Sequence, residues 1–135
     1  MRVYKIVCNV TNNVYIGSTK ESLKKRLVKH SIAFRKWLLS PEDTSYYTSF
    51  KVLENNNYYI EELEKLPDFS ERIELRIRER YWIENTDNVI NKNRAFRTRE
   101  EHKNDIKNYM IVNVIKLKEY NKKYYQNKKS LKLIS

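Results

Sequence analysis

Residues that kink or cross-link a chain are scarce in this sequence of 135 residues, which has one glycine, two prolines and one cysteine. The single Cys8 cannot form a disulfide within the chain, so we expect an intracellular compartment, cytoplasmic or nuclear, rather than secretion. No apolar run approaches the roughly 18 residues that a membrane-spanning helix needs, so no membrane partner is expected. One glycine beside 11 tyrosines, four phenylalanines and two tryptophans excludes collagen and simple disorder.

Positive charge is concentrated towards the C-terminal end. The formal net charge is +11, of which residues 1–91 contribute +2 and residues 92–135 contribute +9. Tyrosines are interleaved with the lysines of the second segment, a pattern that suits stacking on nucleobases. We expect a globular domain over 1–95 and a basic, helix-prone tail over 96–135 that contacts nucleic acid. A tail that only keeps the protein soluble is the simpler alternative.

Two β-branched and aromatic segments at the N-terminal end predict a hairpin. Residues 3–8 and 14–16 are typical of strands, and residues 11–13 (Thr-Asn-Asn) between them predict a turn, because asparagine tolerates positive φ. Residues 17–19 (Gly-Ser-Thr) are expected to close the hairpin and to offer the N-cap of a helix.

The following segments predict three helices and one more strand. The order of elements, β-β-α-α-β-α, predicts an α+β fold in which a small three-stranded antiparallel sheet is flanked by helices and followed by the helical tail. No connection is long enough to require a parallel sheet. The expected elements are a helix from Glu21 to Pro41, a helix over 44–54, a strand from Tyr58 towards Pro67, and a helix capped by Asp68 or Ser70 with the apolar stripe Ile73, Ile77 and Tyr81.

Gly17 and two residues of the first helix stand out from a purely structural pattern. Gly17 follows Tyr15-Ile16 directly, and such a glycine marks either a tight bend, the favoured interpretation, or the close approach of another backbone or a ligand. Arg26 and His30 are four residues apart and therefore share one helix face. Together they suit phosphate binding and proton transfer, although a solvated pair is the simpler interpretation.

Glu79 occupies a position where an apolar residue is expected. It lies in line with Leu75 and Trp82 on a helical wheel. A carboxylate in an apolar line is costly unless it is paired, and it is a suitable ligand for a hard metal ion. An ion pair with one of its arginine neighbours is the competing explanation. These neighbours are Arg76, Arg78 and Arg80.

Taken together, these residues resemble the GIY-YIG endonuclease superfamily over roughly residues 1–95. The family pattern has a GIY-type tripeptide on a first strand, a YIG-type tripeptide on a second, Arg and then His or Tyr on a helix, Glu on a later helix, and Asn about a dozen residues beyond. The matching positions are Arg2-Val3-Tyr4, Tyr15-Ile16-Gly17, Arg26, His30, Glu79 before Arg80-Tyr81-Trp82, and Asn91. Arg2-Val3 replaces the family's Gly-Ile, and Asn93 is a rival to Asn91.

The resemblance implies hydrolysis of a DNA phosphodiester by water with one divalent ion, Mg²⁺ or Mn²⁺, and no small-molecule cofactor. It implies that Glu79 binds the metal and that Tyr4 is the general base, helped by His30 or Tyr15. A tyrosine with an ordinary pKa of about 10 needs a nearby cation for this role. The resemblance further implies that Arg26 clamps the phosphate, that Asn91 orients the site, and that Gly17 leaves room for the DNA backbone.

The basic tail and the apolar residues within it leave several interpretations open. Stand-alone domains with such tails resemble viral and phage forms, some of them homing endonucleases, and repair-type nicking is another role in the family. Four apolar residues predict that the tail either packs on the domain or forms a transient homodimer. These are Val112, Val114, Ile115 and Leu117. The alternative functions are a non-catalytic nucleic-acid-binding protein with a degenerate nuclease domain, and an interaction module that uses the apolar part of the tail.

Overall fold

The computed structural model describes residues 1–68, 70–92 and 95–134, with side chains described up to residue 131. The chain divides into two compact units, Met1–Phe96 and Arg97–Ser135.

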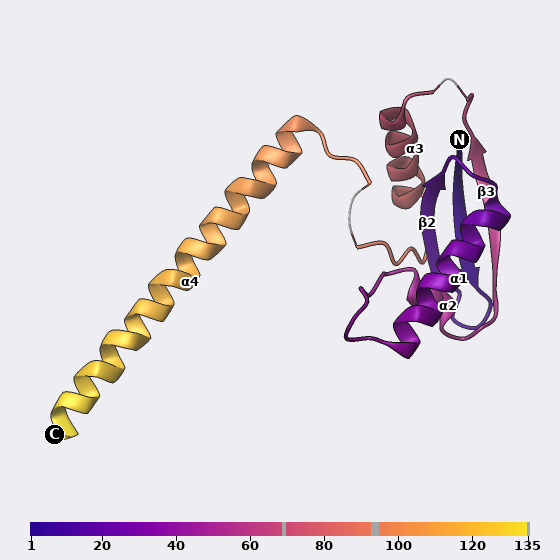
Figure 1. Cartoon of the computed structure of the whole chain (residues 1–135). Helices are drawn as coiled ribbons and strands as arrows, with labels where there is room; N and C mark the ends of the chain where they lie inside the picture. The colour runs from indigo at the N-terminus through magenta and orange to yellow at the C-terminus, as the bar shows by residue number, and fades with distance from the viewer. Residues whose placement is uncertain (69, 93–94, 135) are drawn as a thin grey trace. The chain divides into compact units, whose positions relative to one another are not determined.

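The first unit is built on a three-stranded antiparallel sheet, as predicted. The strands are β1 (Arg2–Cys8), β2 (Val14–Thr19) and β3 (Tyr58–Lys65), in the order β2-β1-β3 (Figure 1). Asn12, with a φ of 62°, makes the predicted turn between β1 and β2. The prediction that Gly17 bends the chain is wrong, because Gly17 lies inside β2 with a negative φ and pairs with Tyr4 across the hairpin. The strand therefore runs three residues past the predicted end.

The three helices of this unit are α1 (Leu23–Leu39), α2 (Phe50–Leu53) and α3 (Arg72–Glu84). The N-cap of α1 is Ser22, whose hydroxyl accepts a hydrogen bond from the Lys25 amide, and not residues 17–19, which belong to β2. The predicted helix over 44–54 is reduced to α2, because the preceding residues form turns. Between those turns, in an irregular segment, Tyr46 and Tyr47 pack edge-on against the Phe50 ring. The predicted caps of α3 are also wrong, since that helix begins after Glu71.

Side chains that alternate along the strands belong to two separate hydrophobic cores, one on each face of the sheet. Val3 and Val7 of β1 point towards α3, whereas Tyr4 and Ile6 point towards α1 and α2. In Figure 1 the helices accordingly cover opposite faces of the sheet. The α3 core also contains Val14, Ile16, Leu66 and Leu75, and the α1 core also contains Cys8, Phe50, Val52 and Leu53.

The apolar stripe predicted for α3 faces the solvent. Ile73, Ile77 and Tyr81 are each more than 40% exposed, whereas Leu75 is 4% exposed and packs against the sheet. The helix carries apolar residues on two faces, and helical spacing alone does not decide which face is buried. Burying the face of Leu75 turns Glu79, one turn further on, towards β2.

Strand β2 is an edge of the sheet, and the chain after α3 covers part of that edge. Val14 of β2 forms a parallel bridge with Val89. The Ile90 amide donates to the Val14 carbonyl at 2.9 Å, and the Val14 amide donates to the Asn88 carbonyl at 2.9 Å. The C-terminal half of β2 has no such cover among the described residues, and the candidate site lies there.

The second unit consists mainly of one helix, α4 (Arg99–Ile134). A reciprocal pair of hydrogen bonds fixes its start: the Thr98 hydroxyl accepts from the Glu101 amide at 3.1 Å, and the Glu101 carboxylate accepts from the Thr98 amide at 2.8 Å. Large apolar and aromatic side chains along the helix are exposed, from Ile106 at 43% to Leu131 at 67%. Within the described residues, no helix is both long and apolar enough to cross a bilayer.

Candidate active site

Three residues of β1 and α1 form a hydrogen-bonded group on one face of the sheet. The Tyr4 hydroxyl lies 2.7 Å from His30 Nε2, and Arg26 Nε donates to the Tyr4 oxygen at 3.1 Å. Since the Arg26 bond uses a lone pair of that oxygen, the Tyr4 proton is free to be donated to His30. Arg26 and His30 reach Tyr4 together because one helical turn separates them, as the sequence predicted.

Burial keeps both partners of the Tyr4–His30 hydrogen bond neutral. Tyr4 is fully buried, and this raises the pKa of its hydroxyl to about 12, against the hydrogen bond and charge of Arg26, which lower it. Burial, followed by the charge of Arg26, lowers the pKa of His30 to about 4. At neutral pH the group therefore holds one cation, one phenol and one neutral imidazole that can still accept a proton.

Tyr15 and Gly17 of β2 lie on the same face as this group. The ring of Tyr15 meets the ring of His30 edge-on, with centroids 5.6 Å apart. Burial and the charge of Glu79 raise the pKa of Tyr15. A Cβ atom on Gly17 would lie 2.5 Å from the Tyr4 hydroxyl oxygen and 2.7 Å from the ring carbon that bears it. Glycine is thus required at this position because the Tyr4 hydroxyl lies against its Cα.

Glu79 approaches the same strand from the opposite face of the sheet. Its carboxylate accepts a hydrogen bond of 2.5 Å from the hydroxyl of Ser18, which follows Gly17 and therefore points towards α3. Burial raises the pKa of Glu79, although the Ser18 bond and the charges of Arg76 and Arg26 lower it. The sequence suggested that Glu79 either binds a metal ion or pairs with a neighbouring arginine. In the structure its recorded hydrogen-bond partner is the Ser18 hydroxyl on β2. The arginine pairs recorded on α3 are Arg78 with Glu64 and Arg80 with Glu84.

Asn91 fastens the segment after α3 to β2. Its side-chain oxygen accepts from the Ile16 amide at 2.9 Å, and its side-chain nitrogen donates to the Ile16 carbonyl at 2.7 Å. Both hydrogen-bonding ends of this amide are therefore engaged with the backbone between Tyr15 and Gly17. The rival residue Asn93 lies outside the described residues.

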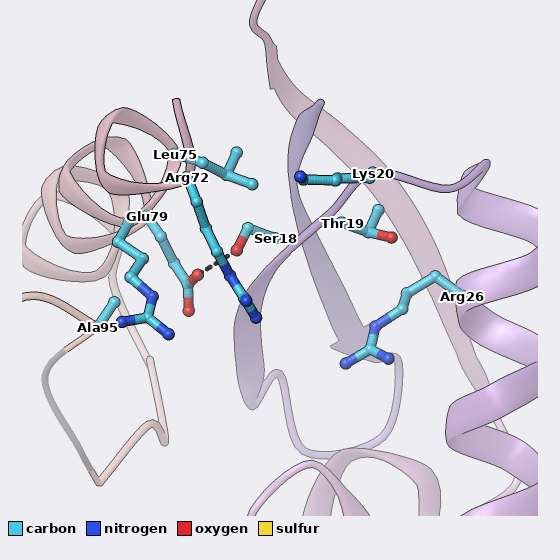
Figure 2. Close-up of a pocket in the computed structure, with 9 residues that line it drawn as sticks. Ser18, Thr19, Lys20, Arg26, Arg72, Leu75, Glu79 and Ala95 are labelled. Atoms are coloured by element: carbon cyan, nitrogen blue, oxygen red, sulfur yellow. Dashed lines mark hydrogen bonds between the residues drawn. The ribbon is translucent and has the colours of Figure 1, made fainter. Parts of the chain in front are cut away.

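Because β2 is an edge, groups from the two faces of the sheet open into shared cavities. A large cavity, of about 650 Å³, is lined by Arg26 on one side and by Ser18 and Glu79 on the other (Figure 2). A cavity of about 260 Å³ contains Tyr15 with Glu79 and Asn91. Among the described residues, further cations that line the large cavity are Lys20, Arg72 and Arg76. The site thus combines one carboxylate with several cations, which suits a phosphate ligand.

The donor set of the large cavity fits a loosely held hard cation. Among the described residues that line it, Glu79 is the one carboxylate, and the hydroxyls of Ser18 and Thr19 are the other oxygen donors from side chains. In the part of the chain that the structure describes, no three His, Cys, Asp or Glu side chains form a closed metal cage. Mg²⁺ commonly binds through one or two carboxylates, with water and substrate phosphate oxygens completing its shell. Glu79 beside an open, cation-lined cavity meets that requirement.

The structure brings every described residue of the predicted site to the C-terminal half of β2 or its immediate neighbours. These are Tyr4, Tyr15, Gly17, Arg26, His30, Glu79 and Asn91. Sequence reasoning missed Ser18, the partner of Glu79. Strand alternation after Tyr15 would have placed it on the α3 face, but the predicted strand ended at Ile16.

Comparison with known proteins identifies the family of this chain. Residues 1–95 match the model of the GIY-YIG catalytic domain, so the chain belongs to the GIY-YIG family, whose catalytic domain is a nuclease domain acting on phosphodiester bonds. GIY-YIG nucleases depend on a metal ion, and a nuclease domain of this kind implies a DNA substrate.

A solved structure shares the fold. The catalytic domain of the intron endonuclease I-TevI, a glutamate-to-alanine mutant, matches with a TM-score of 0.56 and 24% identity. The match covers 73% of this chain and 100% of that one. No curated sequence matches the chain significantly.

The contact between Gly17 and Tyr4 leads to a stability prediction. Gly17→Ala places a methyl group within 2.5 Å of the Tyr4 oxygen, so we expect a loss of about 1–3 kcal/mol in the free energy of unfolding, measured with urea. In a Tyr4→Leu background the hydroxyl and the ring carbon that bears it are both gone, and the same substitution should cost less. An equal cost in both backgrounds would contradict the proposed close approach.

Proposed function

We propose that this nuclease is a DNA endonuclease in which Arg26 and Glu79, approaching from opposite faces of the sheet, act on one scissile phosphate. The observation that carries the proposal is the large cavity that both residues line at the edge strand β2. Arg26 is a half-buried cation whose Nε is held by Tyr4. Its remaining guanidinium nitrogens are directed by that contact and can bind phosphate oxygens, which offsets the charge that develops in the transition state.

Glu79 is the residue we assign to one divalent ion, Mg²⁺ or Mn²⁺. When bound, such an ion polarises the scissile phosphate and stabilises charge on the leaving oxygen. The Ser18 hydroxyl fixes one carboxylate oxygen of Glu79 by the 2.5 Å hydrogen bond. A metal-binding carboxylate must be deprotonated, so the raised pKa of Glu79 should make the site more sensitive to acid than an ordinary glutamate would.

For Tyr4 we propose the role of general base, exerted together with His30. The Tyr4 hydroxyl lies 2.7 Å from His30 Nε2, so Tyr4 can take a proton from water while its own proton moves to the imidazole. The pKa values of about 12 and about 4 make that transfer unfavourable in the resting protein. Positive charge near the phenol oxygen must therefore favour the transfer. Arg26, which already donates to that oxygen, supplies one such charge.

Tyr15, Asn91 and Gly17 complete the proposed site. Tyr15 lines one cavity with Arg26 and another with Glu79, whereas Tyr4 is buried. The Tyr15 hydroxyl is therefore more accessible than that of Tyr4 to the attacking water or the substrate. Asn91 is a positioning residue, since both ends of its amide hold the Ile16 backbone. Gly17 accommodates the Tyr4 hydroxyl, and room for the DNA backbone at Gly17 remains part of the proposal.

For the second unit we propose a DNA-binding role that adds affinity to residues 1–95. From Ile106 to Leu131 helix α4 has seven lysines and one acidic residue, Glu119. An exposed basic helix gains affinity by releasing counterions from DNA phosphates. The homing and viral roles suggested by the tail stay predictions.

A homodimer also stays a prediction. Large side chains on α4 recur in steps of four and three, which is the spacing of a coiled-coil seam, and asparagines complete the series. The series is Ile106, Met110, Asn113, Leu117, Tyr120, Tyr124, Asn127 and Leu131. Lysines flank this seam, among them Lys116 and Lys123. Their mutual repulsion opposes self-pairing in the absence of a polyanion.

Nicking of supercoiled plasmid in Mg²⁺ tests the proposed function. Glu79→Gln removes the metal-binding charge and should slow nicking by about 100-fold or more, because metal stabilisation of the transition state is worth several kcal/mol. Glu74→Gln, an exposed change on the same helix, is the matched control and should leave the rate unchanged. Equal nicking rates for Glu79→Gln and the parent would contradict the role of Glu79, whereas binding without cleavage by the parent would favour the non-catalytic alternative.

The salt dependence of duplex binding tests the role of α4. Lys122→Gln with Lys123→Gln should lower the slope of log K against log salt by up to about 2, because each phosphate contact contributes roughly 0.9. Lys51→Gln with Lys65→Gln, exposed lysines of the first unit, is the control of equal charge. An unchanged slope for the α4 pair would contradict a DNA-binding tail.

A further inference from the structure

Tyr47 connects the two smaller cavities of the site, although no residue of the loop between α1 and α2 was assigned a role. One cavity, of about 260 Å³, holds Tyr47 with Tyr15, Glu79 and Asn91. The other, of about 330 Å³, holds Tyr47 with Tyr15, Arg26 and His30. Tyr47 is therefore a neighbour of both halves of the proposed phosphate site.

The environment of Tyr47 presents its ring to a ligand. Tyr47 is 57% exposed, so much of the side chain is open to solvent. Its ring is nevertheless supported, because it meets the buried ring of Phe50 edge-on, with centroids 5.6 Å apart and planes at 87°. An edge-on contact uses the rim of one ring and leaves area on the Tyr47 ring for a planar group. The Tyr47 backbone is held as well, because its carbonyl accepts a hydrogen bond from the Phe50 amide at 3.0 Å.

We propose that Tyr47 forms a stacking subsite for the nucleobase of a nucleotide adjacent to the scissile phosphate. The subsite rests on the proposed function, since that function puts the phosphate between Arg26 and Glu79. A nucleotide whose phosphate lies there carries its base into the neighbouring cavities, where Tyr47 is the exposed aromatic ring. Stacking on an aromatic side chain is tolerant of base identity, so the subsite adds affinity without strict sequence preference.

The subsite also narrows the class of substrate. A base inside a regular duplex is stacked on both faces and cannot lie against Tyr47 while it remains there. The ligand is thus a nucleotide whose base is out of the stack, at a strand end, at a gap, or turned out during binding. Unstacking costs least where the base is already unpaired or mismatched.

Tyr46 provides a matched control within the same loop. It is also an exposed tyrosine, at 46%, and its ring meets Phe50 edge-on with centroids 5.4 Å apart. Tyr46, however, lines a different cavity with Phe34 and Trp37, away from the proposed catalytic residues. Removing either tyrosine takes one ring from Phe50, but only the loss of Tyr47 removes a ring from the site.

The test measures binding of two small probes by calorimetry, without requiring cleavage. The probes are thymidine 3′,5′-bisphosphate and its abasic analogue, which keeps both phosphates and the sugar. We expect the parent to bind the thymidine probe about tenfold more tightly, as one stacked base would provide. Tyr47→Ala should lose this preference while binding the abasic probe as before, and both Tyr47→Phe and Tyr46→Ala should keep it.

Two results would overturn the subsite: no preference for the base in the parent, or a preference that survives Tyr47→Ala. Loss of the preference in Tyr46→Ala as well would assign the effect to packing of the loop and would also overturn it. Failure of the proposed function is a separate outcome. It would appear as plasmid nicking that ignores Glu79→Gln, whatever the probes do, whereas failure of the subsite would leave the nicking result intact.

Discussion

The buried hydroxyl of Tyr4 is the interaction on which the rest of the site depends. It accepts from Arg26, lies at hydrogen-bond distance from His30, and occupies the space that a side chain at position 17 would need. The antiparallel register that pairs Tyr4 with Gly17 makes this possible, because it brings the one residue without a Cβ to the place where the hydroxyl lies. One cross-strand pair therefore orients a cation and a proton acceptor together, and both come from a single helix face.

Strand β2 adds the second half of the site because it is an edge. In a central strand, the residues on its two faces would be separated by the sheet. At this edge, Tyr15 and Ser18 come from opposite faces and line two cavities that share Glu79. Arg26 and Glu79 line one of these cavities together. The clamp between Asn91 and Ile16 and the bridge at Val89 cover the N-terminal half of the edge and leave the functional half open. An edge of this kind avoids pairing with another strand when it is covered or charged, and here the cations of the cavity contribute to that protection.

Most of the sheet, and the grouping of the candidate site residues, could be predicted from the sequence, because both depend on local signals with fixed spacing. The turn signal at Asn12 predicted the connection of the hairpin correctly. The spacing of Arg26 and His30, one helical turn apart, predicted that they share a face of α1. The errors have physical reasons. Gly17 was predicted as a bend, whereas it is needed for its close contact with Tyr4. That contact is not visible in the local sequence, because Tyr4 is 13 residues away. The predicted stripe of Ile73 and Ile77 faces the solvent, because spacing does not report which side of a helix meets a sheet. Ser18 was missed for the first of these reasons, since the bend cut the strand short.

The central claim is that Arg26 and Glu79 act on the same phosphate across the edge of the sheet. The most direct measurement is a double-mutant cycle on the rate of single-turnover DNA cleavage, with Arg26→Lys, Glu79→Asp and the combined variant, which alter geometry and leave residual activity to measure. Groups that act as one unit are strongly non-additive in such cycles. The account predicts that the combined variant is little slower than the slower single variant. Losses that multiply, as expected of independent sites, would contradict it.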